Sequence, residues 1–236
     1  MNSIRWVAYL ILAGALFSAT PCAAAEELYT YGVHHPVYGE IGKLVYGIER
    51  TGITKRVTAE LRVAISVLGV VVYRYETDSV EVWRGDRLIS LQNRINKNGN
   101  RIEVSGEARG DQFLIASDAG VAAASLDVTP PDPWHVKGVG ASNVISTSTG
   151  RVFHVQISGG ESVMIPIAGA RILARHFSID DDKHHEIWLD GRDVPVMFRS
   201  VELGDAVDFI LKTPSERLVQ PAVPHAQAPL PERADR

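Results

Sequence analysis

The longest regular pattern in the sequence is the fifteen-residue segment ITKRVTAELRVAISV, residues 53–67. One parity of this segment carries the apolar side chains Val57, Ala59, Leu61, Val63, Ile65 and Val67. The other parity carries Arg56, Thr58, Glu60 and Arg62. Successive side chains of a β-strand point to opposite faces, whereas an apolar helix face repeats every three to four residues. The segment therefore predicts a strand with one apolar and one solvated face.

Similar segments recur along the chain, separated by short turns. We expect strands at residues 28–35, 42–50, 69–83, 87–95, 101–108, 112–117, 152–158, 161–168, 170–179, 184–189, 194–202 and 206–211. The expected turns contain Asn98-Gly99, Gly110-Asp111, Gly159-Gly160, Asp190-Gly191 and Gly204-Asp205, and Arg84-Gly85-Asp86 and Arg109-Gly110-Asp111 are interpreted as turns rather than adhesive motifs. Short connections permit antiparallel pairing, since parallel pairing needs long crossovers. The sequence predicts an all-β fold with little helix: a single curled antiparallel sheet forming a half-barrel or open barrel.

One stretch interrupts this rhythm. Residues 126–143, LDVTPPDPWHVKGVGASN, contain three prolines within four positions. We expect this stretch to connect an N-terminal with a C-terminal set of strands, with room for one short helical turn. Trp134 either plugs an open end of the barrel or pins a long surface loop, and the loop is the favoured interpretation.

The N-terminus has the pattern of an export signal. Arg5 precedes an uncharged, mostly apolar run, and TPCAAA precedes Glu26. This order of a charged, an apolar and a small-residue region predicts a signal peptide over residues 1–25, and a periplasmic or secreted protein after cleavage. The alternatives are a retained anchor, for which the run is short, and lipidation of Cys22, which Pro21 disfavours. Cleavage after Ala25 would leave a mature chain without cysteine, because Cys22 is the one cysteine.

The C-terminal residues 213–236 hold five of the chain's twelve prolines and no periodic apolar pattern. We expect a disordered tail there, with a partner-binding arm as the alternative, and a single half-barrel domain over residues 26–212. Without residues 1–25, which contain one basic and no acidic residue, 23 basic residues face 28 acidic ones. This balance does not suggest a nucleic-acid surface, and no stable transmembrane span is expected.

The segment DDDKHHEIWLDGRDV, residues 180–194, has the composition of a metal or catalytic site, but its position favours a charged hairpin. A turn centred on the aspartates would pair Phe177 with Glu186 and place Arg175 on the ring of Trp188. Consecutive histidines point to opposite faces of a strand, so such a pair does not chelate one metal ion. The weak metal candidates are His34, His35, His184 and His185, with His135, His154 and His176 as recruits from elsewhere. No cofactor, metal or catalytic residue is assigned.

A sheet curled over the apolar face of residues 57–67 either fills it with side chains or encloses an apolar cavity. The aromatic residues proposed to line such a cavity are Tyr73, Tyr75, Trp83, Trp134 and Trp188. A cavity would suit an apolar or lipid-like ligand.

Both ends of this core resemble a known group of proteins. The entry YGVHHPVYGEIGKLVYGIE (residues 31–49) and the exit from GARILARHFSI to DVPVMFRSVELGDAVDFIL (residues 169–211) resemble a family of uncharacterised secreted bacterial domains of unknown function. The resemblance spans roughly residues 29–212 and implies a curled antiparallel half-barrel, similar in form to periplasmic lipoprotein-carrier domains. It implies no catalytic residue.

Three functions stay open at this point. The first is a periplasmic binding or carrier module for an apolar or lipid-like ligand. The second is a structural or interaction protein of the cell envelope. The third is a metal-dependent or acid–base hydrolase, which would require His34, His35, His184, His185 and nearby acids to converge.

Overall fold

A computed structural model of the chain describes residues 26–136, 138–167, 169–180, 185–202 and 205–214. These residues all belong to one compact unit, residues 24–221. A second unit, Met1–Ala23 with Ala222–Arg236, lies outside the described residues, and so do the predicted signal peptide and all but two residues of the predicted tail.

Strands make up most of the described chain. The first eight are β1 (Glu26–His35), β2 (Gly39–Thr51), β3 (Thr54–Val67), β4 (Val70–Arg84), β5 (Arg87–Lys97), β6 (Asn100–Arg109), β7 (Gln112–Ser117) and β8 (Gly120–Ala124). A short 3-10 helix, η1 (Pro133–His135), follows. The remaining strands are β9 (Gly140–Ile145), β10 (Val152–Ile167), β11 (Ala170–Asp180), β12 (His185–Leu189), β13 (Pro195–Glu202) and β14 (Asp205–Pro214).

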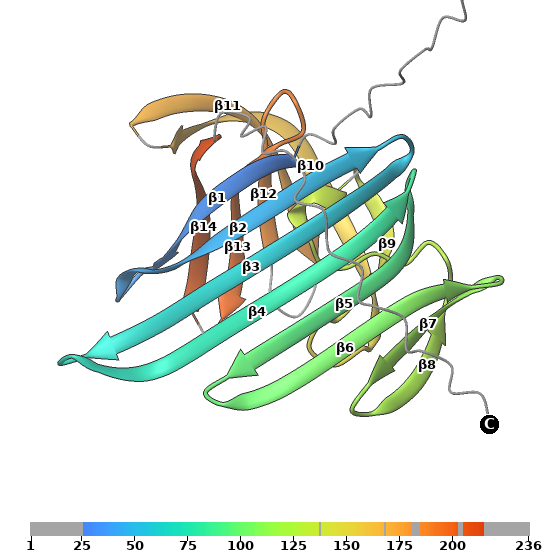
Figure 1. The fold of residues 1–236 in the computed structure, drawn as a ribbon. Coiled ribbons are helices and arrows are strands. Elements are labelled where there is room, and N and C mark those ends of the chain that lie inside the picture. The colour runs from blue at the N-terminus through green and yellow to red at the C-terminus, as the bar shows by residue number, and fades with distance from the viewer. Residues whose placement is uncertain (1–25, 137, 168, 181–184, 203–204, 215–236) are drawn as a thin grey trace, which may run out of the picture. The chain divides into compact units, whose positions relative to one another are not determined.

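All fourteen strands belong to one antiparallel sheet, in the order β8-β7-β6-β5-β4-β3-β2-β1-β14-β13-β12-β11-β10-β9. The first and last strands thus pair in the middle of the sheet, and β8 and β9, which are consecutive in the chain, form its two edges. In the described residues β8 and β9 do not pair with each other, so the sheet curls but does not close into a barrel (Figure 1). The predicted all-β, half-barrel fold is confirmed.

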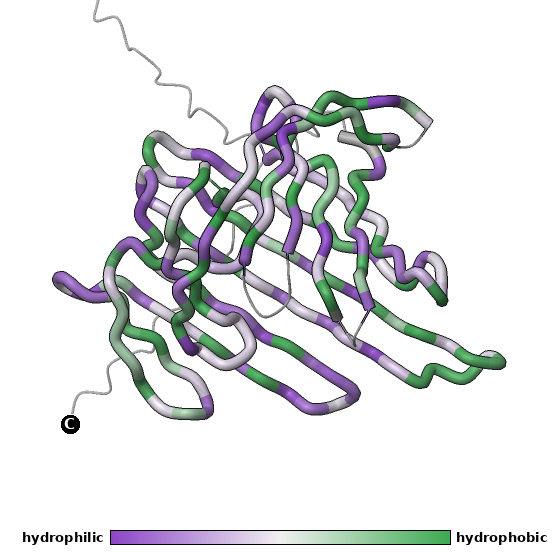
Figure 2. The backbone as a smooth tube through the Cα atoms, turned by 180° about the vertical axis from the view of Figure 1, so that it is seen from behind, coloured by the Kyte–Doolittle hydropathy of each residue, from purple (hydrophilic) through white to green (hydrophobic). Residues whose placement is uncertain are grey.

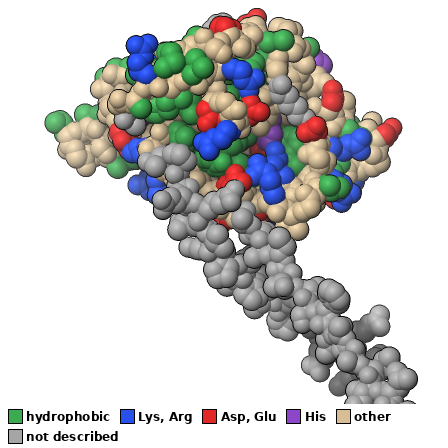
Figure 3. Space-filling model, turned by 90° about the horizontal axis from the view of Figure 1, so that it is seen from above, with side chains coloured by type: hydrophobic (Ala, Val, Ile, Leu, Met, Phe, Trp, Pro, Cys, Tyr) green, Lys and Arg blue, Asp and Glu red, His purple; other side chains and the backbone are tan. Residues whose placement is uncertain are grey.

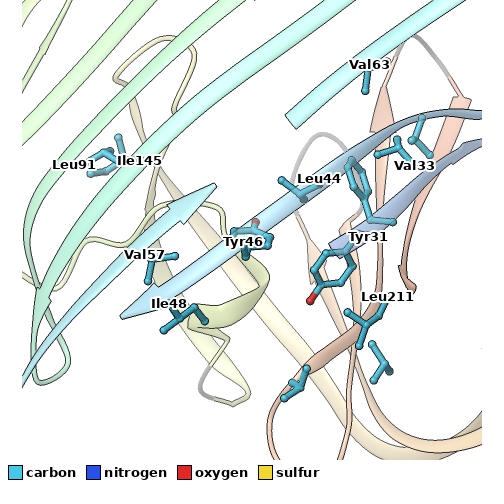
Figure 4. Packing of buried hydrophobic residues seen from close by; sticks show 14 of the residues in the cluster. Tyr31, Val33, Leu44, Tyr46, Ile48, Val57, Val63, Leu91, Ile145 and Leu211 are labelled. Atoms are coloured by element: carbon cyan, nitrogen blue, oxygen red, sulfur yellow. The ribbon is translucent and has the colours of Figure 1, made fainter. Parts of the chain in front are cut away.

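The core lies on the concave face of the curled sheet. The alternation of β3 is confirmed as far as Ile65, since Val57 and Ile65 are buried and Glu60 is exposed, but Val67, predicted on the apolar face, is 45% exposed. Figure 4 shows buried side chains converging from β1, β2, β3, β5, β9 and β14, with Leu91 of β5 next to Ile145 of β9. Burying such side chains is worth roughly 1.5–3 kcal/mol each, which offsets the entropy lost in ordering a chain without disulfides.

The stretch between β8 and β9 contains one helical turn and crosses to the far edge strand. Asp132 caps η1 by accepting a hydrogen bond from the Trp134 N–H at 2.7 Å. The Trp134 ring lies 4.5 Å from that of Tyr29 and 6.0 Å from that of Tyr46, between centroids. Trp134 therefore packs over the paired residues Tyr29 of β1 and Tyr46 of β2 and anchors the crossover, as the favoured interpretation expected. Val128 and His135 beside it are buried, however, so the crossover is not a surface loop.

Two features of the sheet differ from expectation. Strands β8 and β9 were not predicted, because GVAAA and GASNVI hold few β-branched residues. Gly159 and Gly160 do not form a turn between two strands but a bulge within β10, at φ 101° and 97°. A Cβ at Gly159 would lie 2.4 Å from the His176 backbone oxygen, so glycine permits this close approach of β10 and β11.

The β11–β12 hairpin is present, but its register is one residue away from the prediction. His176 pairs with Trp188 and Phe177 with Ile187, so Phe177 does not face Glu186 and Arg175 does not lie on Trp188. Instead the Trp188 ring stacks on His176 at 4.7 Å, and the Arg175 guanidinium lies 5.4 Å from the Phe177 ring. A slip of one residue moves every side chain to the other face, and the prediction had assumed a two-residue turn. Residues 181–184 lie outside the described chain.

Candidate functional site

The concave face of the sheet encloses a cavity of about 770 Å³. This volume lies within the range of small-molecule sites. Aliphatic and aromatic side chains from β1 to β4, β9, β10 and β12 to β14 form much of its wall, among them Val33, Ile41, Leu44, Leu61, Val63, Val155, Ile157, Ile187, Phe198 and Phe209. Figure 3, a view from above, shows apolar side chains in a hollow bordered by charged ones.

Strand β4 gives the cavity two chemically different ends. Its inward-facing side chains are, in order, Tyr73, Tyr75, Thr77, Ser79, Glu81 and Trp83, and all but the last line the cavity. At about 3.3 Å per residue, Tyr73 and Glu81 lie roughly 26 Å apart along the strand. The cavity is therefore acidic at the Glu81 end, whereas the Tyr73 end combines aromatic and aliphatic side chains with His35, His185, Arg199 and Ser200.

The acidic end is formed by Glu81, Asp132 and His135, which we call the acid–His cluster. The His135 Nε2 atom lies 2.9 Å from Glu81 Oε2, and both side chains are buried. Trp83 Nε1 donates a hydrogen bond to the same Glu81 oxygen at 2.8 Å, and the Trp83 ring stacks on His135 at 4.0 Å. The helix η1 supplies Asp132 and His135, and β4 supplies Glu81 and Trp83. Residues distant in sequence thus meet because the crossover lies inside the curled sheet.

The cluster perturbs the protonation of its members. Burial raises the pKa of Glu81 to about 7, against the hydrogen bond from Trp83 and the positive charge of Lys55. Burial and the nearby charge of Glu81 raise the pKa of Asp132 to about 6, against the charge of His135 and hydrogen bonds from Trp134 and Tyr46. Burial also keeps the pKa of Tyr46 well above its ordinary value. Protons or other positive charges are therefore favoured at this end of the cavity.

The same three residues could hold a metal ion. One ligand atom from each lies within 4.8 Å of the others, and among the described residues this is the group of three or more metal-type ligands that the structure brings together. Two carboxylates and one imidazole suit a borderline divalent cation such as Zn²⁺ or Mn²⁺. The existing hydrogen bond between Glu81 and His135 satisfies both side chains without an ion.

Beside the cluster, polar atoms in the cavity wall lack partners. The Asn93 side chain is 1% exposed, and its Nδ2 donates to the Thr147 carbonyl at 2.8 Å. Its Oδ1 atom and the Thr77 Oγ1 atom are buried and have no hydrogen-bond partner among the described residues, and both residues line the cavity. A buried polar atom left unpaired costs about 1–3 kcal/mol, which a ligand with N–H or O–H donors would recover.

The structure separates the five aromatic residues predicted to line a cavity. Tyr73 and Tyr75 line it. Trp83 and Trp134 lie at the acid–His cluster, where Trp83 donates to Glu81 and Trp134 follows Asp132. Trp188 is not among the lining residues; it packs between His176 and Arg199, whose guanidinium lies 5.9 Å from its ring. Their roles in binding stay predictions.

The four candidate histidines are not assembled into one metal site in the described residues. His35 is buried, lines the cavity and lies 3.5 Å from Asp205, whereas its neighbour His34 is less buried. His185 also lines the cavity, and its Nε2 lies 2.9 Å from Ser200 Oγ. His184 lies outside the described residues. His135, considered only as a recruit, is the histidine that meets two carboxylates.

Sequence reasoning missed Glu81 and Asp132. The position of Glu81 in β4 could have revealed it. Glu81 is an even number of residues from Tyr73 and Tyr75, so it lies on the same inward face of the strand, where an acidic side chain is unexpected. The signal for Asp132 was the order Asp-Pro-Trp-His, a capping residue followed by proline at the first helical position. Neither signal reveals that β4 and η1 meet.

Comparisons with known proteins place the fold but not a function. Residues 39–212 match the family model described as "Domain of unknown function (DUF6134)". The chain is similar to the crystal structure of a β-barrel-like protein of the domain of unknown function DUF1849 from Brucella abortus, with 7% identity, 80% of this chain and 95% of that chain covered, and a TM-score of 0.57. It also matches a DUF1089 family protein from Pseudomonas aeruginosa at 12% identity, over 80% of this chain and 95% of that chain, with a TM-score of 0.39. The first similarity concerns the fold alone, and the second is too weak to support a conclusion.

A search of curated proteins gave no match. Within the described residues, no helix has the length and apolar character needed to cross a membrane.

Proposed function

The chain belongs to the DUF6134 family, and we propose that its domain binds an amphiphilic small molecule in the cavity of the curled sheet. The observation that carries this proposal is the chemical asymmetry of the cavity. Aromatic and aliphatic side chains predominate towards Tyr73, beside a few polar ones such as His35 and Arg199, and the acid–His cluster lies at the other end.

The apolar end suits a hydrocarbon chain. Val63 and Tyr75 are paired neighbours on β3 and β4, and both line the cavity. Phe198 and Phe209, whose rings stack at 4.5 Å, supply part of the opposite wall. Transfer of a chain from water to such a wall yields about 0.8 kcal/mol per CH₂ group.

The acidic end selects the head group. Glu81, Asp132 and Asn93 Oδ1 offer acceptor oxygens, and the burial that raises the pKa values of the two acids supports a preference for added positive charge at this end. An amine or a polyol would satisfy these atoms. A carboxylate or phosphate head at this end would meet buried Glu81 and half-buried Asp132, and it is therefore disfavoured there.

We place this binding outside the cytoplasm, in the periplasm or after secretion, as the proposed signal peptide over residues 1–25 requires. A carrier fits this setting, because a sheet with a solvated outer face keeps an apolar ligand in solution. The proposal includes no catalytic step.

Two measurements test the proposal. Native mass spectrometry of the protein isolated from its host without detergent is expected to show a stoichiometric adduct that is lost on denaturation. Titration with dodecylamine and dodecanoate, followed by tryptophan fluorescence, is expected to show binding of the amine at least tenfold tighter, because Trp83 and Trp134 flank the cluster.

The Glu81→Gln variant should reduce this preference, whereas the matched control Glu103→Gln should not. Glu103 is exposed and pairs with Arg94 on the sheet surface. A clean apo mass together with no response to either amphiphile would contradict the proposed function. Equal binding of both amphiphiles would contradict the assignment of the head-group end.

A further inference from the structure

The turn between β3 and β4 is unusually apolar for an exposed hairpin tip. Its residues Val67, Leu68, Val70, Val71 and Val72 have exposed fractions of 45%, 98%, 64%, 46% and 57%. Figure 2 shows this tip as a hydrophobic end of a long hairpin. Single exposed apolar residues are common, but five in one turn form a patch.

The backbone conformation of the turn does not require these apolar residues. Leu68 and Gly69 have φ angles of 53° and 81°, the left-handed conformation that disfavours a branched side chain. The neighbouring β5–β6 turn has the same backbone form, with φ angles of 52° and 89°, and uses the preferred Asn98 and Gly99. Leucine in this turn thus costs conformational energy and exposes apolar surface.

The neighbouring tips extend the patch in two directions. The turns of β1–β2, β3–β4 and β5–β6 lie side by side at one end of the sheet (Figure 1). On one side, Val37 and Tyr38 are 72% and 49% exposed. On the other, residues 97–101 carry Lys97 and Arg101 and no acid, and Asn98 Oδ1 accepts a hydrogen bond from the Arg74 N–H at 2.7 Å.

We propose that this row of tips docks on the surface of a lipid membrane. Leu68 and the valines enter the boundary between head groups and acyl chains, Tyr38 lies at the interface, and Lys97 and Arg101 meet anionic head groups. A second copy of the chain fits this surface less well, since a standard interface takes about 20–30 residues from each partner and the three tips offer only residues 37–38, 67–72 and 97–101.

The inference goes beyond the proposed function and does not depend on it, because membrane contact is measured without a ligand. The two fit together, however. The cavity lining reaches Tyr73, which directly follows exposed Val72, so a docked tip would place the Tyr73 end of the cavity next to the bilayer.

The test is flotation of the full chain with vesicles. One set contains phosphatidylethanolamine and phosphatidylglycerol, and the other contains only neutral phosphatidylcholine. The double variant Leu68→Asn/Val70→Thr keeps the turn geometry and should lose at least tenfold in binding to both sets. Lys97→Gln/Arg101→Gln should weaken binding to the anionic vesicles alone and reduce its salt dependence.

The matched control is Ile53→Thr. Ile53 is 73% exposed in the β2–β3 turn, at the opposite end of β3, and this variant should float as the unaltered protein does. A retained N-terminal segment that alone held the protein on vesicles would make the tip variant float equally well, which would overturn the proposal. So would failure of the unaltered protein to float with either set, or a dimer in light scattering that Leu68→Asn/Val70→Thr dissociates.

Discussion

The two ends of the sheet each reverse the usual distribution of side chains, and they do so differently. At the η1 end, the acids Glu81 and Asp132 lie inside, but His135, Trp83 and the Trp134 N–H satisfy them. At the tip end, Leu68 lies outside at 98% exposure. The first reversal is compensated within the chain, and the second is not. The difference is consistent with the two proposals: the buried end is satisfied within the fold, where we propose a ligand head group, and the exposed tip is where we propose contact with a membrane.

The largest expected effect is at the buried end. Trp83→Ala should lower the free energy of unfolding by about 3–5 kcal/mol, because it opens a cavity and removes the donor to Glu81. Urea unfolding followed by circular dichroism measures this loss. Ile53→Ala, at an exposed turn, should change stability by less than about 0.5 kcal/mol. Equal losses would remove the distinction between buried and exposed ends.

The second prediction concerns pH. Because the folded pKa of Glu81 is raised from 4.5 to about 7, the folded state holds this proton more tightly than the unfolded state. The protonated Glu81 side chain therefore contributes to the free energy of unfolding in full below about pH 4.5, and this contribution is lost as the pH rises through about 7. The loss is on the order of 3 kcal/mol. Glu81→Gln should therefore flatten the pH dependence in chemical unfolding and stabilise the protein at pH 8. An unchanged slope in this variant would show that Glu81 is not the group responsible.

The third prediction transfers the apolar turn to its neighbour. Asn98→Leu should cost about 1 kcal/mol, because leucine is disfavoured at φ 52° and the hydrogen bond to Arg74 is lost. Thermal unfolding measures the cost. No loss of stability would mean that the turn tolerates leucine, and Leu68 would then need no external explanation.

The smallest effect is the reverse substitution. Leu68→Asn should raise stability by a few tenths to about 1 kcal/mol, since asparagine suits the left-handed turn and no buried contact is removed. Differential scanning calorimetry of the full chain resolves such a change. A destabilised variant would show that Leu68 packs within its own chain.

The alternation of apolar and polar residues along β3 was enough to predict the class of the fold, because the sequence of each strand shows which of its side chains point inward and which outward. The turns Arg84-Gly85-Asp86 and Arg109-Gly110-Asp111 were predicted for the same local reason, and Gly85 and Gly110 have φ angles of 58° and 62°. The bulge at Gly159 was not predicted, because a glycine pair fits a turn and a bulge equally well.

The candidate site was less predictable. Tyr73 and Tyr75 could be placed on the inner face by parity, and the cavity beside them was one of two expected outcomes. The acid–His cluster depends on where η1 lies over β4, which no pattern within either segment specifies. The predicted register of β11 against β12 was wrong for a related reason: the residues of the two strands do not specify the length of the charged turn between them.

The pairing of β1 with β14 has a consequence for how the chain can be assembled. Strands β2 to β8 can each add to the strand before them as they are synthesised, but one side of β1 stays unpaired until residues 205–214 arrive. The last strand made is thus a central strand and not an edge. A chain ending before Asp205 would consist of two separate meanders, β1–β8 and β9–β13, with unpaired edges where the sheet should be continuous.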